Sequence, residues 1–167
     1  MNLFFLRHGK AFERSPKFRP DSKRPLTREG EKKTREVARG IRELEEHFDL
    51  ILTSPYIRAL RTAEILADVL KSNKMSVTNN LAAEANPHAL VDEINRSFSG
   101  RQNIVLVGHE PYLSGLISIL LTGGPDLRMD FKKAGFCKLE VDHLRFEKCS
   151  FLAWLLTPGQ LVRIGNG

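Results

Sequence analysis

The sequence has little cysteine, no long apolar run and no basic leader. Cys137 and Cys149 are the only cysteines among 167 residues, and they do not form a CxxC pair. A disulfide framework is therefore excluded, and a reducing, cytoplasmic location is expected. No stretch approaches the roughly 18 apolar residues of a membrane span. The first residues, MNLFFLRHGK, lack a basic n-region and a small-residue cleavage site, so we expect neither a membrane segment nor a signal peptide.

Acidic residues are also in the minority, with 20 Asp and Glu against 26 Lys and Arg and a net charge of +6. The excess lies near the start, because residues 7–39 hold twelve basic and five acidic side chains. Such a field favours an anionic substrate or an acidic partner surface, and a solvated helix and loop is the plainer alternative. Helix-turn-helix, zinc-finger and RNA-binding signatures are absent from the sequence, so nucleic acid is not an expected partner.

The chain length suits one domain, so residues 1–167 are expected to share one core. Short apolar runs at residues 3–6, 50–52 and 103–107 are typical of strands buried on both faces. A weaker strand is expected at residues 75–78. The segments 136–141 and 150–157 predict a further pair of strands joined around residues 143–147.

Helices are predicted between these strands. They run from an N-cap at Thr27 to about Glu46, from Pro55, capped by Ser54, to about Leu70, from Pro87 to Gly100, and from Pro111 to Gly123. Strands that alternate with helices predict an α/β fold, a three-layer α/β/α sandwich with a mostly parallel central sheet. The last two strands could add an antiparallel edge.

Polar residues follow three of the predicted strands directly. They are Arg7-His8-Gly9, Ser54-Pro55 with Arg58, and Gly108-His109. If these strands are parallel, their carboxyl ends share the edge of the sheet where ligands bind in open α/β folds. Arg58 falls in the first turn of its helix, where free N–H groups already favour an anion. The pattern predicts a phosphate-binding site that contains a histidine.

The chemistry of the first cluster suits phosphate transfer. Arg7 offers a planar, permanently charged fork to an oxyanion. His8 can act as a nucleophile or proton carrier near neutral pH. Gly9 allows a sharp turn or the close approach of a ligand.

Three motifs resemble the histidine phosphatase (phosphoglycerate mutase-like) superfamily: LRHGKA at 6–11, SPYIRALRTAEIL at 54–66 and VGHEPYLSGL at 107–116. The segment DSKRPLTREG at 21–30 and the short chain are similar to the SixA-type phosphohistidine phosphatases. The resemblance implies that His8 is the nucleophile and becomes phosphorylated, and that Arg7, Arg58 and His109 hold the phosphoryl group. It also implies that Arg24 contacts substrate.

Alternatives stay open for individual residues. Arg58 could instead pair with Glu64 or another helix carboxylate, and Arg24 could be a solvated loop charge. Glu84, in the segment LAAEANP, is a candidate proton donor or a solvated loop residue. Glu110 could face solvent at a helix start. The remaining histidines, His47, His88 and His143, match no motif and are expected at the surface or at helix ends.

The preferred function is hydrolysis of phosphohistidine in a protein substrate, without a metal or other cofactor. A small-molecule phosphomonoesterase of the same superfamily is the second possibility, with a small phosphorylated molecule as substrate. A non-catalytic anion-binding regulatory module is the third. A metallohydrolase is disfavoured because the sequence has no compact HxxxH spacing and places cations around His8.

Overall fold

Six strands form one mixed sheet in the computed structural model, which describes residues 1–44 and 46–167. The order across the sheet is β3-β2-β4-β1-β5-β6. The strands are β1 (Asn2–Arg7), β2 (Leu50–Thr53), β3 (Met75–Val77), β4 (Asn103–Gly108), β5 (Phe136–Val141) and β6 (Ser150–Leu156). Strands β1 to β4 are parallel to one another, whereas β5 is antiparallel to β1 and β6 is antiparallel to β5. The expected parallel sheet with an antiparallel edge is therefore confirmed.

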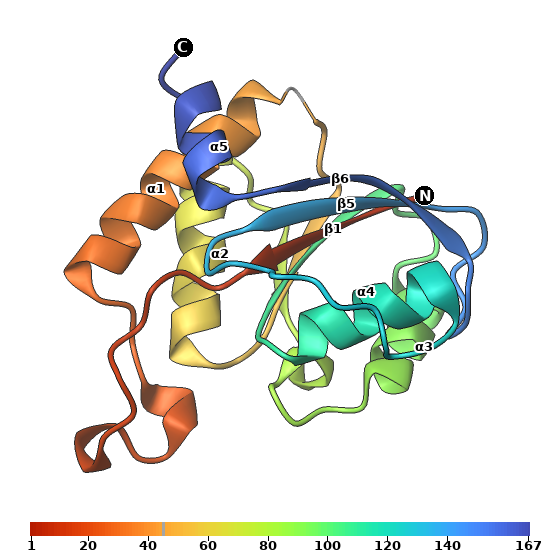
Figure 1. Ribbon diagram of the computed structural model, residues 1–167, viewed down its shortest axis with the longest axis horizontal. Coiled ribbons are helices and arrows are strands. Elements are labelled where there is room, and N and C mark those ends of the chain that lie inside the picture. The colour runs from red at the N-terminus through yellow and green to blue at the C-terminus, as the bar shows by residue number, and fades with distance from the viewer. Residues whose placement is uncertain (45) are drawn as a thin grey trace.

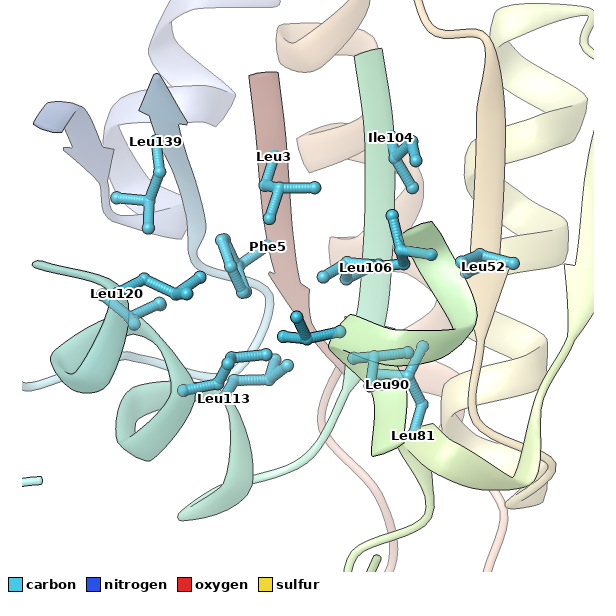
Figure 2. Packing of buried hydrophobic residues seen from close by; sticks show 14 of the residues in the cluster. Leu3, Phe5, Leu52, Leu81, Leu90, Ile104, Leu106, Leu113, Leu120 and Leu139 are labelled. Atoms are coloured by element: carbon cyan, nitrogen blue, oxygen red, sulfur yellow. The ribbon is translucent and has the colours of Figure 1, made fainter. Parts of the chain in front are cut away.

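Helices cover both faces of the sheet (Figure 1). Helices α1 (Arg28–Glu43), α2 (Ile57–Leu70) and α5 (Pro158–Ile164) lie on one face, and α3 (Pro87–Ser97) and α4 (Tyr112–Thr122) lie on the other. The central strands alternate accordingly: Phe4 packs toward α1 and α2, and its neighbour Phe5 packs toward α3 and α4. Figure 2 shows the packing of α3 and α4 on the sheet, with Leu90 and Leu113 against the sheet residues Phe5 and Leu106. The three-layer α/β/α sandwich is confirmed.

Helix α1 ends at Glu43, earlier than the predicted end near Glu46. Leu44 already bonds back to the carbonyl of Ile41. Beyond the helix, Phe48 packs edge-on against Phe4 with ring centroids 4.9 Å apart. Burial of this aromatic pair in the core outweighs continued helix propensity, which is a weak local preference.

Helix α2 begins at Ile57 rather than at Pro55, and its N-cap is Tyr56. The hydroxyl of Ser54 accepts from the backbone N–H of Tyr56, 3.3 Å away, in the bend before the helix. Helix α3 stops at Ser97, three residues before the predicted Gly100. These are boundary corrections that leave the element order unchanged.

Helix α5 was not predicted. Thr157 and Gln160 form a capping box that starts it. Its Leu161 is buried against α1, where a Cβ on Gly40 would lie 1.9 Å from the Leu161 carbonyl oxygen. Gly40 therefore allows the two helices to touch backbone to backbone.

The β1–α1 loop, residues 12–26, is the long polar segment that the sequence indicated. It contains two short 3₁₀ turns, η1 (Pro16–Phe18) and η2 (Asp21–Lys23). A bridge between Ala11 and Leu26 closes its base, and the loop projects from the body beside the start of α2 (Figure 1).

Across the described residues, none of the helices combines the length and apolarity needed to cross a bilayer.

Candidate active site

The parallel strands bring the three predicted polar clusters together. The backbone N–H of His8 bonds to the carbonyl of Gly108 at 3.0 Å, and that of Ser54 bonds to Val107 at 3.0 Å. The rings of His8 and His109 are 5.2 Å apart between centroids. His8, Arg58 and His109 are only 6%, 3% and 1% exposed. The convergence expected from topology is thus present, in a largely buried site.

His8 is oriented by its neighbour. Its Nδ1 lies 2.7 Å from the carbonyl oxygen of Gly9. Because a carbonyl only accepts, Nδ1 carries the proton and Nε2 keeps its lone pair. Burial, and then the charges of Arg58 and Arg7, lower the pKa of His8 to about 3 against the opposing Gly9 hydrogen bond. The imidazole is therefore neutral at physiological pH, and its Nε2 carries the lone pair that a nucleophile needs.

His109 lies on the other side of the site. Its Nε2 is 2.7 Å from the hydroxyl of Ser54. Burial first, and then the electrostatic interaction with His8 and the charge of Arg58, lower the pKa of His109 to about 3. Its Nδ1 is buried and has no hydrogen-bond partner among the described residues. A ligand oxygen could satisfy that nitrogen.

Arg7 is held by one end of its guanidinium. Nη1 donates to the carbonyl of Phe131 at 2.7 Å, whereas Nε is buried and finds no acceptor within the described part of the chain. Burial lowers the pKa of Arg7, and the carboxylates of Glu110 and Asp130 oppose that effect. An unpartnered buried donor costs about 1–3 kcal/mol, and more in a charged group. An anion in the site would offset that cost.

Arg58 connects His8 to the β1–α1 loop. Its Nε donates to Nε2 of His8 at 3.2 Å. Its Nη1 donates to the backbone carbonyl of Asp21 at 2.9 Å, and Nη2 lies 3.0 Å from the Asp21 carboxylate. The alternative partner Glu64 is wrong, because Glu64 pairs with Arg61 at 3.2 Å.

Asp21 binds Arg24 as well as Arg58. Nε of Arg24 donates to its carboxylate at 2.9 Å, and Nη1 of Arg24 donates to the carbonyl of Phe12. Burial would raise the pKa of Asp21, but the Arg24 hydrogen bond and the charges of Arg58, Arg24 and Arg14 lower it overall. The Arg24 side chain is 14% exposed. Arg24 is thus an organised part of the loop, and the solvated-charge alternative is wrong.

Glu84 lies outside the buried part of the site. Its exposed carboxylate accepts a hydrogen bond from the hydroxyl of Tyr56, and this bond is the main reason that the pKa of Tyr56 is raised. The Tyr56 ring packs against His109, with centroids 4.9 Å apart, and against the guanidinium of Arg58 at 5.2 Å. Glu110 is occupied at the start of α4, where it accepts from the backbone of Ser114 at 3.0 Å.

Gly9, just after β1, contacts Thr62 of α2 and Thr34 of α1. The Gly9 N–H donates to the Thr62 hydroxyl at 3.1 Å, and that hydroxyl donates to the carbonyl of Arg58 at 2.7 Å. A Cβ on Gly9 would lie 2.2 Å from the hydroxyl oxygen of Thr34. Glycine is required here by the close approach of α1, rather than by a left-handed turn.

Sequence reasoning missed three residues that shape the site. Ser54 was expected to cap a helix, yet its hydroxyl also contacts His109. Asp21 and Tyr56 were passed over although both lie in the quoted motifs. Their signal was proximity to a cation in the sequence, since a carboxylate and an aromatic ring are common neighbours of guanidinium groups.

The other histidines lie away from this cluster. His47 is 74% exposed and lies 3.3 Å from the Asp49 carboxylate, and the His88 ring packs at a tilt against that of Phe146, with centroids 5.0 Å apart. Within residues 1–44 and 46–167, no three His, Cys, Asp or Glu side chains are grouped so that they could hold a metal ion.

Comparison with known proteins places these residues in a family context. The model of the histidine phosphatase superfamily (branch 1) matches residues 3–84, which include His8 and Arg58. An uncharacterized protein from Picosynechococcus sp. is 36% identical over 148 residues, covering 88% of this chain and 89% of that protein.

Two solved structures show the same fold. The protein histidine phosphatase SixA, complexed with tungstate, superposes with a TM-score of 0.82 at 23% identity, over 96% of this chain and 99% of SixA. A phosphoserine phosphatase from Entamoeba histolytica superposes with a TM-score of 0.65 at 17% identity, over 96% and 98% of the two chains.

Proposed function

This chain belongs to the histidine phosphatase superfamily, and we propose that it hydrolyses phosphohistidine in a protein substrate through a phosphorylated His8. One observation carries the proposal. The lone pair of His8 Nε2 lies beside Arg58 Nε, in a buried site where Arg7 Nε and His109 Nδ1 lack partners among the described residues. These groups match the needs of a phosphoryl group, which requires a nucleophile and several donors for its oxygens.

In the first step, Nε2 of His8 attacks the phosphorus atom. The P–N bond of the substrate breaks, and its electron pair stays on the leaving imidazole, which is protonated at its other nitrogen. Arg7, Arg58 and His109 donate to the phosphoryl oxygens, whose charge is spread over three atoms in the transition state. Arg24 is proposed as a substrate contact at the edge of the site.

In the second step, water attacks phosphorus and the bond to His8 Nε2 breaks, which restores the neutral imidazole and releases inorganic phosphate. The low pKa of His8 favours this departure. A nitrogen that binds a proton weakly is also a better leaving group, so His8 leaves phosphorus as a neutral imidazole. Splitting the hydrolysis into two transfers is the advantage of a covalent intermediate.

The protein substrate is proposed on two grounds. SixA, which shares the fold over nearly the whole chain, is named a protein histidine phosphatase. Glu84, the candidate proton donor, is exposed and hydrogen-bonded to Tyr56. We also propose a cytoplasmic location, which the free cysteines Cys137 and Cys149 support.

A small-molecule phosphomonoesterase is the second candidate. It is favoured by the Tyr56–Glu84 hydrogen bond, which holds a carboxyl group near His109, and by the shared fold of a phosphoserine phosphatase. A test would compare initial rates on a phosphohistidine protein with those on a panel of phosphomonoesters, each with and without EDTA. The proposal expects the phosphohistidine protein to be the best substrate in both conditions. A sugar phosphate or phosphoserine as best substrate would favour the phosphomonoesterase, and no turnover at all would favour an anion-binding module.

A further inference from the structure

The β1–α1 loop is fixed to the catalytic cluster at its centre. Asp21, in η2, contacts both terminal nitrogens of Arg58, while Arg24 bonds to Asp21 and to the carbonyl of Phe12. The backbone N–H of Phe12 bonds in turn to the carbonyl of Pro25. The outer part of the loop is therefore held at a defined position relative to His8.

This outer part is both aromatic and basic. Phe12 is 44% exposed, and its ring lies 5.4 Å from that of the half-buried Phe18. The ammonium group of Lys17 lies 5.6 Å from the Phe18 ring centroid. Arg14, with 83% of its side chain exposed, and the exposed Arg19 flank the pair. We call Phe12, Arg14, Lys17, Phe18 and Arg19 the loop face.

A pocket of about 580 Å³ is lined by loop residues between Arg14 and Asp21, including Arg14, Phe18 and Arg19 of the loop face, and by Glu84. It adjoins the site, because Asp21 contacts Arg58 and Glu84 contacts Tyr56. Phe12 and Lys17 are not part of its lining. A ligand that fills only the pocket would leave these two residues untouched.

We propose that the loop face docks the protein that carries the phosphohistidine, through an acidic surface with exposed aliphatic side chains next to the phosphorylated histidine; this rests on the proposed function. Exposed guanidinium and ammonium groups complement carboxylates, and their contribution is mainly to encounter and partner choice. The exposed phenyl ring of Phe12 beside them buries its apolar surface only when a partner covers it. Such a ligand fills the pocket and also covers Phe12 and Lys17, whereas a small metabolite confined to the pocket contacts neither of these two residues.

The test uses four phosphohistidine substrates and the full-length protein. The substrates are free phosphohistidine and three peptides with a single phosphohistidine, flanked by Gly and Ser, by Glu and Leu, or by Lys and Leu. The wild type is expected to show a KM for the Glu/Leu peptide about tenfold below that for the Gly/Ser peptide. This preference should weaken as salt is raised, because the charges are exposed.

Two single variants change the residues of the loop face that do not line the pocket. Lys17→Glu should abolish the preference for the Glu/Leu peptide and improve the Lys/Leu peptide. Phe12→Ser should raise KM for both leucine-containing peptides. Lys32→Glu on α1 makes the same change in net charge as Lys17→Glu, at an exposed position outside the loop, and should behave like the wild type. Turnover of free phosphohistidine should stay within about twofold in all variants, which also reports correct folding.

Other results would overturn the docking proposal. Equal KM values for the three peptides in the wild type, or equal losses in the loop and α1 charge variants, would show that the loop face does not select substrate. A loss on free phosphohistidine as large as that on peptides would show that the loop serves a small ligand. Competitive inhibition by a short DNA oligonucleotide, lost in the loop variants, would assign the face to nucleic acid. Failure of the wild type on all four substrates, with turnover of phosphomonoesters, would refute the proposed function itself.

Discussion

Nε of Arg58 donates to Nε2 of His8 across 3.2 Å, so a guanidinium group contacts the nitrogen proposed as nucleophile before substrate binds. An incoming phosphoryl group would take the lone pair of His8, and the same Arg58 N–H would then meet a phosphoryl oxygen. The guanidinium is therefore in place without a large movement of either side chain, as preorganised electrostatic stabilisation requires.

The first prediction concerns covalent catalysis by His8. Brief incubation with a phosphorylated substrate should label the protein with phosphate that is labile in acid and stable in base, as expected for phosphohistidine. His8→Ala should lose both the label and turnover, because no other nitrogen occupies that position. His47→Ala, which removes an exposed histidine, is the control and should keep both. Full labelling of the His8→Ala protein would end the proposal.

The second prediction is that two buried histidines make stability pH-dependent. The pKa values of His8 and His109 are lowered to about 3 in the folded state, against about 6.5 in an unfolded chain. Between about pH 3 and pH 6.5 the unfolded state therefore binds more protons than the folded state. The free energy of unfolding is highest above about pH 6.5 and falls as the pH drops toward 3. Each histidine contributes at most ~1.4 kcal/mol per pH unit.

Urea unfolding at about pH 7, 6 and 5 measures this effect, because this range lies within the pH interval over which the two histidines titrate in the unfolded chain. The range also lies above the pH values at which most carboxylates titrate. His109→Gln should show a shallower loss of stability than the wild type over this range, whereas His47→Ala should match the wild type. Identical slopes in the wild type and His109→Gln would mean that His109 is not held neutral by the fold.

The third prediction is that Asp21 positions Arg58. Asp21→Asn keeps the backbone contact to Arg58 Nη1 but removes the carboxylate charge beside Nη2. We expect kcat to fall by about 10- to 100-fold with little change in KM, because a small displacement of an aligned group is costly mainly in the transition state. Asp68→Asn removes an exposed ion pair with Arg35 and should leave both constants unchanged. A kcat equal to wild type in Asp21→Asn would show that Arg58 needs no such support.

Sequence alone located the sheet and the four residues at its edge, because both depend on local patterns. Apolar runs of four residues, at 3–6 and 104–107, are followed two residues later by His8 and His109, and the parallel order of strands joined by helices then fixes a common edge. The β1–α1 loop was recognised as a loop, but its contact with Arg58 could not be predicted. That contact joins Asp21 to a residue 37 positions later, and the polar loop carries no periodicity that places it against the sheet.

The predicted helix boundaries were wrong for a related reason. The end of α1 is set by the packing of Phe48 on Phe4, and the short α5 is stabilised by its contact with Gly40. Both contacts are long-range, and tertiary packing overrides local propensity in such cases. Ser54 shows the same limit, since its hydroxyl contacts a histidine 55 residues away.

The last prediction concerns substrate preference, and it follows from the position of Glu84. A phosphomonoester expels an alkoxide, which leaves poorly unless an acid protonates it. Phosphohistidine expels an imidazole, whose own pKa lies near 6.5, so that it can leave after protonation at its other nitrogen. Glu84 is exposed and bonded to Tyr56 rather than to a group of the buried cluster. General acid catalysis is worth about 10²–10⁴-fold where it operates, so its absence should penalise esters and spare the P–N bond.

We therefore expect kcat/KM for a phosphohistidine protein to exceed that for sugar phosphates or phosphoserine by about 100-fold or more. Glu84→Gln should change turnover of the P–N substrate by less than about threefold, because an amide can still accept the Tyr56 hydrogen bond while donating no acidic proton. Tyr56→Phe, which removes the same hydrogen bond from the other side, should be equally mild on this substrate. A Glu84→Gln protein that keeps phosphohistidine activity but loses a faster ester hydrolysis would instead identify Glu84 as the general acid of a phosphomonoesterase.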